Sequence, residues 1–270
     1  MPPDVVPAPA PSAKSSPPLL EVRGLCIDLA GTKDVRSLVG GDGTGVDFEV
    51  AAGESVGLVG DSGSGKTLTA LSLMGLLPPT VVQSAGTIDF AGSGMTAQAG
   101  CAIIFQEPRS ALNPLFSIGY QIGEVLQLRG MRGKALRDRG LELLEQVAMP
   151  DPESRWRSFP HELSGGQCQR VMIAMALAAE PRLLIADEPT TALDVSVQAQ
   201  ILSLLSQLQD REGLALLMIS HDLALIGATC DRLLVMDRGL VVERGAVEQI
   251  FSQPESETSR RLLGAAMSQT

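Results

Sequence analysis

The sequence predicts a three-layer α/β core, in which helices cover a mainly parallel sheet. Two apolar runs, 182–186 and 215–219, have the composition of strands buried on both faces. Segments with helical spacing of apolar residues alternate with such strands, for example at 197–208. This alternation is typical of an α/β core, and ligands bind such sheets where the strands end.

Bulk composition narrows the functional classes. Of the 270 residues, 44% are hydrophobic, so the chain can bury a substantial core. The net charge of −10 disfavours a broad nucleic-acid-binding face, which would need clustered Lys and Arg. The 4 cysteines form no Cys-x-x-Cys pair, which favours reduced structural thiols in a cytosolic protein over a disulfide framework or a zinc site. No apolar run reaches the roughly 20 residues of a membrane span, so we expect any work at a membrane to depend on a partner.

The N-terminal part is expected to form a tail and then an antiparallel β layer. Residues 1–18 are rich in Pro, Ala and Ser and are predicted to be a mobile tail. Residues 19–29 and 46–50 alternate between apolar and polar side chains, which is typical of strands, and a Gly-rich connection at 40–45 joins them. Further strand candidates are 55–59, 87–90 and 102–105.

The middle of the chain is mainly helical. Leu136, Leu143, Leu144 and Val147 fall on one stripe at helical spacing within 118–149. The segment from about 107 to 168 is therefore predicted to be a helical subdomain inserted in the core. Further predicted elements are an apolar helix at 171–178, a hairpin around 237–239 and a helix from Ala246 onward.

One glycine-rich stretch fits the phosphate-binding P-loop, G-x-x-x-x-G-K-[ST]. Its glycines let successive backbone N–H groups form an anion-binding nest, and the helix expected to start near Lys66 adds its positive end. Lys66 is expected to reach the β- and γ-phosphates and Thr67 to place a hydroxyl on Mg²⁺. The stretch is Gly60-Asp61-Ser62-Gly63-Ser64-Gly65-Lys66-Thr67.

Polar residues that follow other strands complete a candidate catalytic site. Asp187 follows a buried strand and is the candidate carboxylate for Mg²⁺. Glu188 is the candidate general base for the attacking water. Gln106 can offer an amide oxygen to Mg²⁺ and to that water, and His221 can contact the γ-phosphate.

A second anion site is predicted before an apolar helix. Ser164 is a candidate N-cap, and Gly165 and Gly166 expose backbone amides at the helix start. Because the chain has one P-loop, this second site is expected to serve a nucleotide held by another copy or by a partner.

Taken together, these motifs resemble those of the ATP-binding cassette (ABC) ATPases. The resemblance covers nearly all of residues 19–255, and the motifs occur in the order found in that family. They are Walker A at 60–67, the Q-loop Gln106, the signature Leu163-Ser164-Gly165-Gly166-Gln167, Walker B at 183–188, the D-loop Ala192-Leu193-Asp194 and the switch His221.

A finer resemblance is to the ATP-binding subunits of oligopeptide, dipeptide and nickel importers. It rests on the extended segment after Gln106 and on the residues that flank the signature and the D-loop. The family fold implied for residues 19–270 is a P-loop NTPase core with an N-terminal antiparallel β subdomain and the helical subdomain. The family usually stacks adenine on an aromatic side chain, and Leu29 occupies that position here.

The resemblance also implies cofactors and partners. ATP would lie between the Walker A loop of one cassette and residues 164–167 of the other, with Mg²⁺ held by Thr67, Gln106 and Asp187. The second cassette would be an identical copy or a paralogue. Two integral-membrane permeases and an extracytoplasmic substrate-binding protein would complete an importer for peptides, nickel or a metal chelate. The chain would then lie at the cytoplasmic face of the inner membrane and bind no nucleic acid.

Three other functions fit the sequence less well. Non-transport ABC proteins of DNA repair or chromosome maintenance usually carry long coiled coils or zinc modules between the Q-loop and the signature, and here that interval is short and helical. Exporter subunits are disfavoured because no membrane segment is fused to the chain. A simple kinase would not explain residues 163–167.

Overall fold

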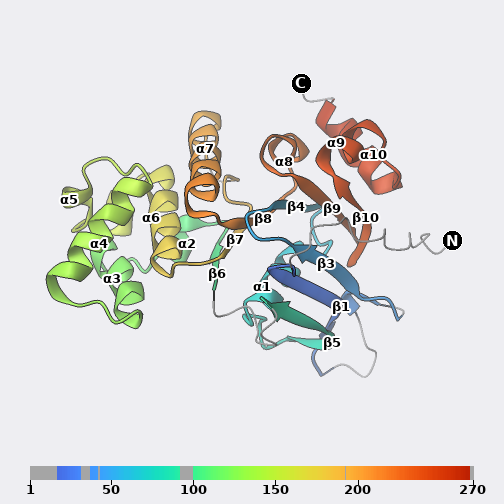
Figure 1. Cartoon of the computed structure of the whole chain (residues 1–270), viewed down its shortest axis with the longest axis horizontal. Coiled ribbons are helices and arrows are strands. Elements are labelled where there is room, and N and C mark those ends of the chain that lie inside the picture. The colour runs from blue at the N-terminus through green and yellow to red at the C-terminus, as the bar shows by residue number, and fades with distance from the viewer. Residues whose placement is uncertain (1–16, 32–36, 42, 92–99, 192, 268–270) are drawn as a thin grey trace. The chain divides into compact units, whose positions relative to one another are not determined.

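The computed structural model describes residues 17–31, 37–41, 43–91, 100–191 and 193–267 (Figure 1). The predicted tail therefore lies almost wholly outside the described residues, as does Ala192 of the D-loop. The chain divides into two compact units, one formed by residues up to Ala99 together with those from Ala215 onward, and the other by Gly100–Leu214. Each is described by itself below.

The first unit contains the antiparallel sheet that the sequence predicts. Strand β1 (Leu20–Leu29) pairs antiparallel with β2 (Ser37–Val39), β3 (Val46–Val50) and β5 (Val81–Phe90). In β3 the side chains alternate between buried and half-buried, in agreement with the sequence pattern. The short β2 was not predicted, and β5 begins at Val81 rather than at 87 because the register with β1 extends from Phe90 back to Val81.

A second sheet of this unit supports the candidate phosphate site. β4 (Ser55–Gly60) pairs in parallel with β8 (Ala215–Ser220) and β9 (Arg232–Asp237), and β9 forms the predicted hairpin with β10 (Leu240–Ala246). Every residue of β4 and β8 is buried. The helices of the unit are α1 (Lys66–Leu73), α8 (Leu223–Thr229), α9 (Val247–Ser252) and α10 (Glu257–Met267), the last two drawn in red in Figure 1.

The second unit combines a parallel strand pair with helices. β6 (Cys101–Ile104) runs parallel to β7 (Leu183–Asp187). The helical stretch expected over 118–149 is divided, because Gly130 adopts a φ of 85° between two helices. The helices are α2 (Pro108–Ala111), α3 (Ile118–Leu128), α4 (Gly133–Gln146), α5 (Pro152–Arg155), α6 (Gly165–Ala178) and α7 (Val195–Glu212) (Figure 1).

The Trp156 indole packs against both α3 and α4 of this unit. A Cβ atom on Gly119 would lie 2.3 Å from the indole Cε2, and one on Gly140 would lie 2.2 Å from Cζ3. Both glycines therefore leave the space that the indole fills. Aromatic residues make up only 3% of the chain, so the Trp156 indole is an uncommon packing group in this protein.

Candidate functional site

The P-loop lies between a buried strand and a helix, in the context that the motif requires. β4 ends at Gly60 and α1 begins at Lys66. A Cβ on Gly60 would lie 2.2 Å from the carbonyl oxygen of Met236, so only glycine fits there. Gly65 precedes the helix with a φ of 103°, a conformation that L side chains rarely adopt. Glycine at these two positions therefore allows a tight turn in which no Cβ atom covers the backbone.

Lys66 is positioned inside this loop. Its side chain is buried, at 6% exposure, and Nζ donates to the carbonyl oxygens of Gly60 and Asp61, each at 2.9 Å. Thr67 is exposed in the first turn of α1. The Ser64 hydroxyl is buried and finds no hydrogen-bond partner among the described residues. A buried ammonium group and an unsatisfied hydroxyl in a glycine-rich turn fit a phosphate group.

Asp61 of the P-loop contacts the C-terminal helix, which sequence reasoning missed. Arg261 of α10 donates from both terminal nitrogens to the two carboxylate oxygens of Asp61, and one of these contacts measures 3.0 Å. Nothing local in the sequence signals this pair, because its members lie 200 positions apart. A cavity of about 440 Å³ opens beside it, lined by Asp61, Ser62, Gly63, Ser64, Asp237, Arg238, Glu257, Thr258 and Arg261.

His221 lies in the same unit as the P-loop, directly after β8. Ser220 and Asp222 fix the backbone on either side of it. The Asp222 amide donates to Ser220 Oγ at 2.9 Å, and the Asp222 carboxylate caps α8 by accepting from the amides of Ala224 and Leu225. The His221 side chain is exposed at the carboxyl end of its strand, as the sequence predicts.

The candidate Walker B carboxylates lie in the second unit. Asp187 ends β7 and is buried, at 5% exposure. Glu188 follows with a φ of 47°, in the left-handed region that side chains with a Cβ enter rarely. Its Oε2 accepts from Gln106 Nε2 and from Thr191 Oγ1, both at 2.9 Å. The structure therefore brings Gln106 and Glu188 into direct contact, and it adds Thr191, which sequence reasoning missed.

The signature forms the predicted start of a helix. Ser164 Oγ accepts from the Gln167 amide at 3.3 Å, and Gln167 Oε1 accepts from the Ser164 amide at 3.0 Å, which together make a capping box on α6. A Cβ on Gly166 would lie 2.6 Å from Cγ1 of Val197 in α7, whereas one on Gly165 would make an ordinary contact of 3.5 Å with Leu193. Gly166 is therefore also required by the packing of α6 against α7.

Asp194 of the D-loop caps the adjoining helix. Its carboxylate accepts from Ser196 Oγ at 2.7 Å and from the Val197 amide at 3.0 Å. The hydrogen bond from Ser196, followed by that from Val197, lowers the pKa of Asp194 below its ordinary value. Asp194 and Gly166 both contact Val197, so the start of α7 connects the D-loop to the signature.

The side chains predicted to hold Mg²⁺ carry donor atoms of the kind that this ion binds. Thr67 offers a hydroxyl, Asp187 a buried carboxylate and Gln106 an amide oxygen, all hard oxygen donors of the kind this ion prefers. Within the described ranges, no cluster of three or more His, Cys, Asp or Glu residues could hold a metal ion. Each of these side chains therefore suits Mg²⁺ by the chemistry of its donor atom.

Comparison with known proteins gives the family. The sequence pattern of the family described as ABC transporter matches residues 44–191. The chain is 46% identical over 229 residues to the dipeptide transport ATP-binding protein DppD of Haemophilus influenzae, spanning 81% of this chain and 69% of that protein. It is 51% identical over 232 residues to the peptidoglycan transport ATP-binding protein YejF of Agrobacterium fabrum, but covers only 42% of that protein's length.

Solved structures agree with the family. The cbiO1 protein of Clostridium perfringens, described as part of the ABC transporter complex cbiONQ, matches 93% of this chain and 96% of its own with a TM-score of 0.72 and 25% identity. The ATP-binding cassette MJ0796, solved as a dimer with ADP and Pi, matches 84% of this chain and 98% of its own with a TM-score of 0.71 and 25% identity. The chain therefore belongs to the ABC transporter ATPases, and the predicted fold class is confirmed.

Proposed function

We propose that this chain is the ATP-hydrolysing subunit of an ABC importer for peptides. The observation that carries the proposal is the buried Lys66 ammonium group, held inside a glycine-rich loop between a buried strand and a helix. The relatives cited above are named for dipeptide and peptidoglycan transport, which supports a peptide-like cargo and speaks against DNA repair or chromosome maintenance. Nickel or a metal chelate stays a prediction that rests on the sequence resemblance alone.

In this proposal the P-loop binds the phosphates of ATP. The backbone amides of residues 60–67 and the Lys66 ammonium bind the β- and γ-phosphates, and the Ser64 hydroxyl lies unsatisfied within the loop. Thr67, Asp187 and Gln106 hold Mg²⁺, which neutralises charge on the phosphates when bound. Leu29, half-buried at the end of β1, offers the base an aliphatic surface in place of an aromatic ring.

Glu188 takes the proton of the attacking water, and His221 contacts the γ-phosphate. The contacts of Glu188 support its role, because two donors fix its carboxylate while its backbone stays in a strained conformation. A carboxylate held in this way loses little orientational freedom when it acts.

A partner cassette, identical or paralogous, completes the catalytic cycle. Ser164, Gly165, Gly166 and Gln167 bind the partner's ATP, and Asp194 lies at the same interface. The dimeric state of MJ0796 and the complex that contains cbiO1 support this assembly by analogy. Two permeases and a substrate-binding protein complete the importer, with this chain at the cytoplasmic face of the inner membrane. In the part of the chain that the structure describes, no helix is long and apolar enough to cross a membrane.

Two variants test the nucleotide chemistry. Lys66→Ala should lose ATP binding, measured by calorimetric titration with a non-hydrolysable ATP analogue. Glu188→Gln should keep ATP binding but hydrolyse ATP at least about 100-fold more slowly, since a general base contributes that factor or more. It should also accumulate as a dimer with ATP. Glu145→Gln, an exposed carboxylate on α4, is the matched control and should behave as wild type. Unchanged turnover in Glu188→Gln would refute the assignment of the base.

The cargo is tested separately by uptake in cells. Removing this chain should reduce the uptake of a labelled dipeptide and leave the uptake of ⁶³Ni²⁺ unchanged. The Lys66→Ala variant should fail to restore peptide uptake, whereas the Glu145→Gln variant should restore it. Loss of nickel uptake alone would contradict the peptide assignment.

A further inference from the structure

The P-loop of this chain carries an acidic side chain that faces a specific basic partner. Asp61 is the second residue of the loop, and its backbone carbonyl accepts one of the hydrogen bonds from Lys66 Nζ. Its carboxylate is bound by both terminal nitrogens of Arg261 in a bidentate ion pair. Such paired contacts are directional as well as electrostatic.

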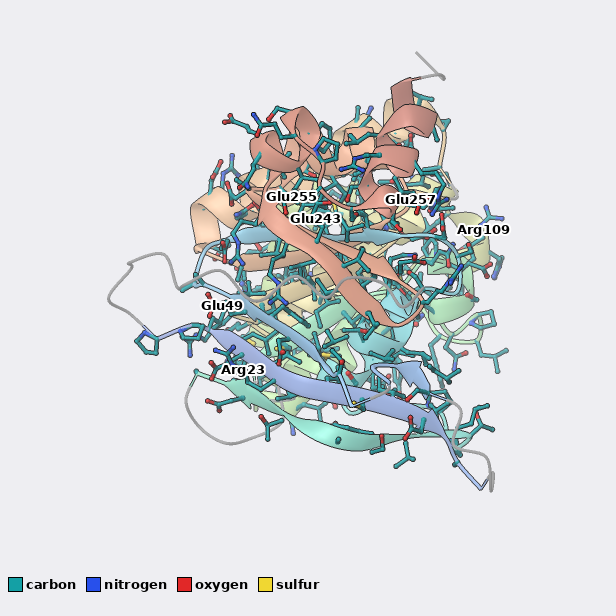
Figure 2. All side chains as sticks on the ribbon, turned by 90° about the vertical axis from the view of Figure 1, so that its right-hand side faces the viewer. Arg23, Glu49, Arg109, Glu243, Glu255 and Glu257 are labelled. Carbon is teal, nitrogen blue, oxygen red and sulfur yellow. The ribbon has the colours of Figure 1, made fainter. Side chains whose placement is uncertain are left out.

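Helix α10, which carries Arg261, is fixed to the unit at its N-terminal end. The carboxylate of Glu243 on β10 accepts from the amides of Glu255 and Ser256 at 2.9 and 2.8 Å, and from Ser259 Oγ at 2.5 Å. Figure 2 shows Glu243 and Glu255 close together beside the red C-terminal segments. Arg261 therefore projects from an anchored helix.

A second contact anchors α10 closer to the loop. Thr258 is buried and its hydroxyl donates to Asp237 Oδ2 at 3.1 Å, at the end of β9. The amide of Gly239, in the turn after β9, donates to the carbonyl oxygen of Ser64 in the P-loop at 3.0 Å. The turn between β9 and β10 thus contacts the P-loop directly while β9 holds α10.

The charges of the Arg261–Asp61 ion pair affect how the P-loop binds a nucleotide. A carboxylate on a loop that binds a triphosphate repels the ligand, because like charges a few ångströms apart disfavour one another. The Arg261 guanidinium neutralises that carboxylate, and the side-chain hydrogen bond from Arg261 keeps the pKa of Asp61 below its usual value. Besides Asp61, the carboxylates of Asp237 and Glu257 act on Arg261 and raise its pKa further.

We propose that Arg261 is a positioning residue of the nucleotide site, which acts through Asp61 by neutralising the carboxylate that would otherwise repel the phosphates. The inference rests on the proposed ATP-binding function of that loop. It predicts that an uncharged residue at position 261 weakens ATP binding, and that the loss reverses when Asp61 is neutralised as well. A contact that only stabilised the fold would not produce this reversal.

The test measures the affinity of the full chain for a non-hydrolysable ATP analogue at low and high salt. Arg261→Gln should weaken binding about two- to fivefold at low ionic strength, the range expected for one exposed ion pair, and less at high salt because screening removes the repulsion. Arg261→Gln combined with Asp61→Asn should bind at least as tightly as wild type. Arg261→Lys, which keeps the charge, should retain most of the affinity.

Arg260→Gln is the matched control, because Arg260 lies on the same helix and its side chain donates to the carbonyl oxygens of Pro254 and Glu255 rather than to the P-loop. It should bind the analogue as wild type does. Wild-type affinity in Arg261→Gln at low salt, an equal loss in Arg260→Gln, or no recovery in the double variant would each overturn the inference. A wild-type chain that binds no ATP analogue would instead contradict the proposed function.

Discussion

Gln106 donates its side-chain amide to the carboxylate of Glu188, with 2.9 Å between Nε2 and Oε2. Gln106 lies two residues beyond the end of β6, and Glu188 directly follows the neighbouring parallel strand β7. The Gln106 amide therefore helps to hold the orientation of the Glu188 carboxylate. The backbone of Glu188 is itself strained, at a φ of 47°. Movement of the segment after β6 would release one of the two side-chain donors to this carboxylate.

We predict that loss of either donor slows hydrolysis more than it weakens binding. Gln106→Ala and Thr191→Val each remove one hydrogen bond to Glu188, so the base spends less time correctly oriented. The expected fall in kcat is about threefold to tenfold, which corresponds to the roughly 1 kcal/mol of a typical hydrogen bond. Steady-state ATP hydrolysis at saturating Mg²⁺ gives kcat and KM.

The control is the double variant. Because both donors act on one carboxylate oxygen, the two effects should not multiply. Independent, multiplying losses, or a rise in KM with an unchanged kcat, would contradict the orienting role of these two side chains.

Gly166→Ala should destabilise the second unit, whereas Gly165→Ala should not. The new methyl group at 166 would lie 2.6 Å from Val197 Cγ1, and valine has little rotamer freedom with which to yield. We expect the free energy of unfolding to fall by about 1–2 kcal/mol. At 165 the methyl group makes an ordinary 3.5 Å contact with Leu193. Urea denaturation of both variants checks the difference, and equal stabilities would refute this packing role.

The attachment of α10 should weaken in acid. Burial by itself raises the pKa of Glu243, but the hydrogen bonds donated by Glu255, Ser259 and Ser256 outweigh it and hold the pKa below its ordinary value. The carboxylate therefore contributes its full stabilisation above the unfolded pKa of about 4.3. That contribution is lost as the pH falls from there through the lower pKa of the folded state.

Hydrogen exchange of the amides in 257–266 measures this attachment. In wild type their protection should fall as the pH is lowered from about 6 to about 3, after correction for the intrinsic exchange rate. Glu243→Gln should lower the protection already at about pH 6, by about 1–3 kcal/mol for a lost charged acceptor, and should show less change with pH. Glu248→Gln, an exposed carboxylate on α9, should follow wild type. Full protection of these amides at about pH 3 in wild type would contradict the role of the Glu243 carboxylate in holding α10.

Two cysteines should resist alkylation in the folded protein. Burial raises the pKa of the Cys101 and Cys230 thiols to about 12, so little of the reactive thiolate is present near neutral pH. With iodoacetamide at about pH 8, modification of both should be at least about tenfold slower than in urea, where the thiol pKa returns to about 8.5. Peptide mass spectrometry reads each site, and equally fast labelling of the folded chain would contradict the raised pKa values of the two thiols.

Local patterns in the sequence predicted the parts of the site that each lie within one segment. The glycines and Lys66 form a strand–loop–helix unit, and Ser164 and Gln167 form a capping box, because both depend on residues close together in the chain. The roles of these residues toward ATP stay predictions. The fold class followed from alternating buried strands and helices, and the sheet pairings agree with it.

Contacts between distant segments escaped prediction because no spacing rule links their members. Arg261 and Asp61 are 200 positions apart, and Glu243 reaches its amide partners only because β10 and the residues before α10 are folded together. The short β2 owes its place to pairing with β1, and Gly130 divides the helical stretch by its conformation. Such features depend on tertiary packing rather than on periodicity.

Trp156 gives the molecule a built-in optical reporter. It is the chain's 1 tryptophan, and its indole lies against Gly119 of α3 and Gly140 of α4. The tryptophan emission of the whole protein therefore originates in the helical part of the second unit. Thermal unfolding, the docking of another subunit or any other event that separates α3 from α4 should change the emission of Trp156. Such events can therefore be followed by intrinsic fluorescence without attaching a dye.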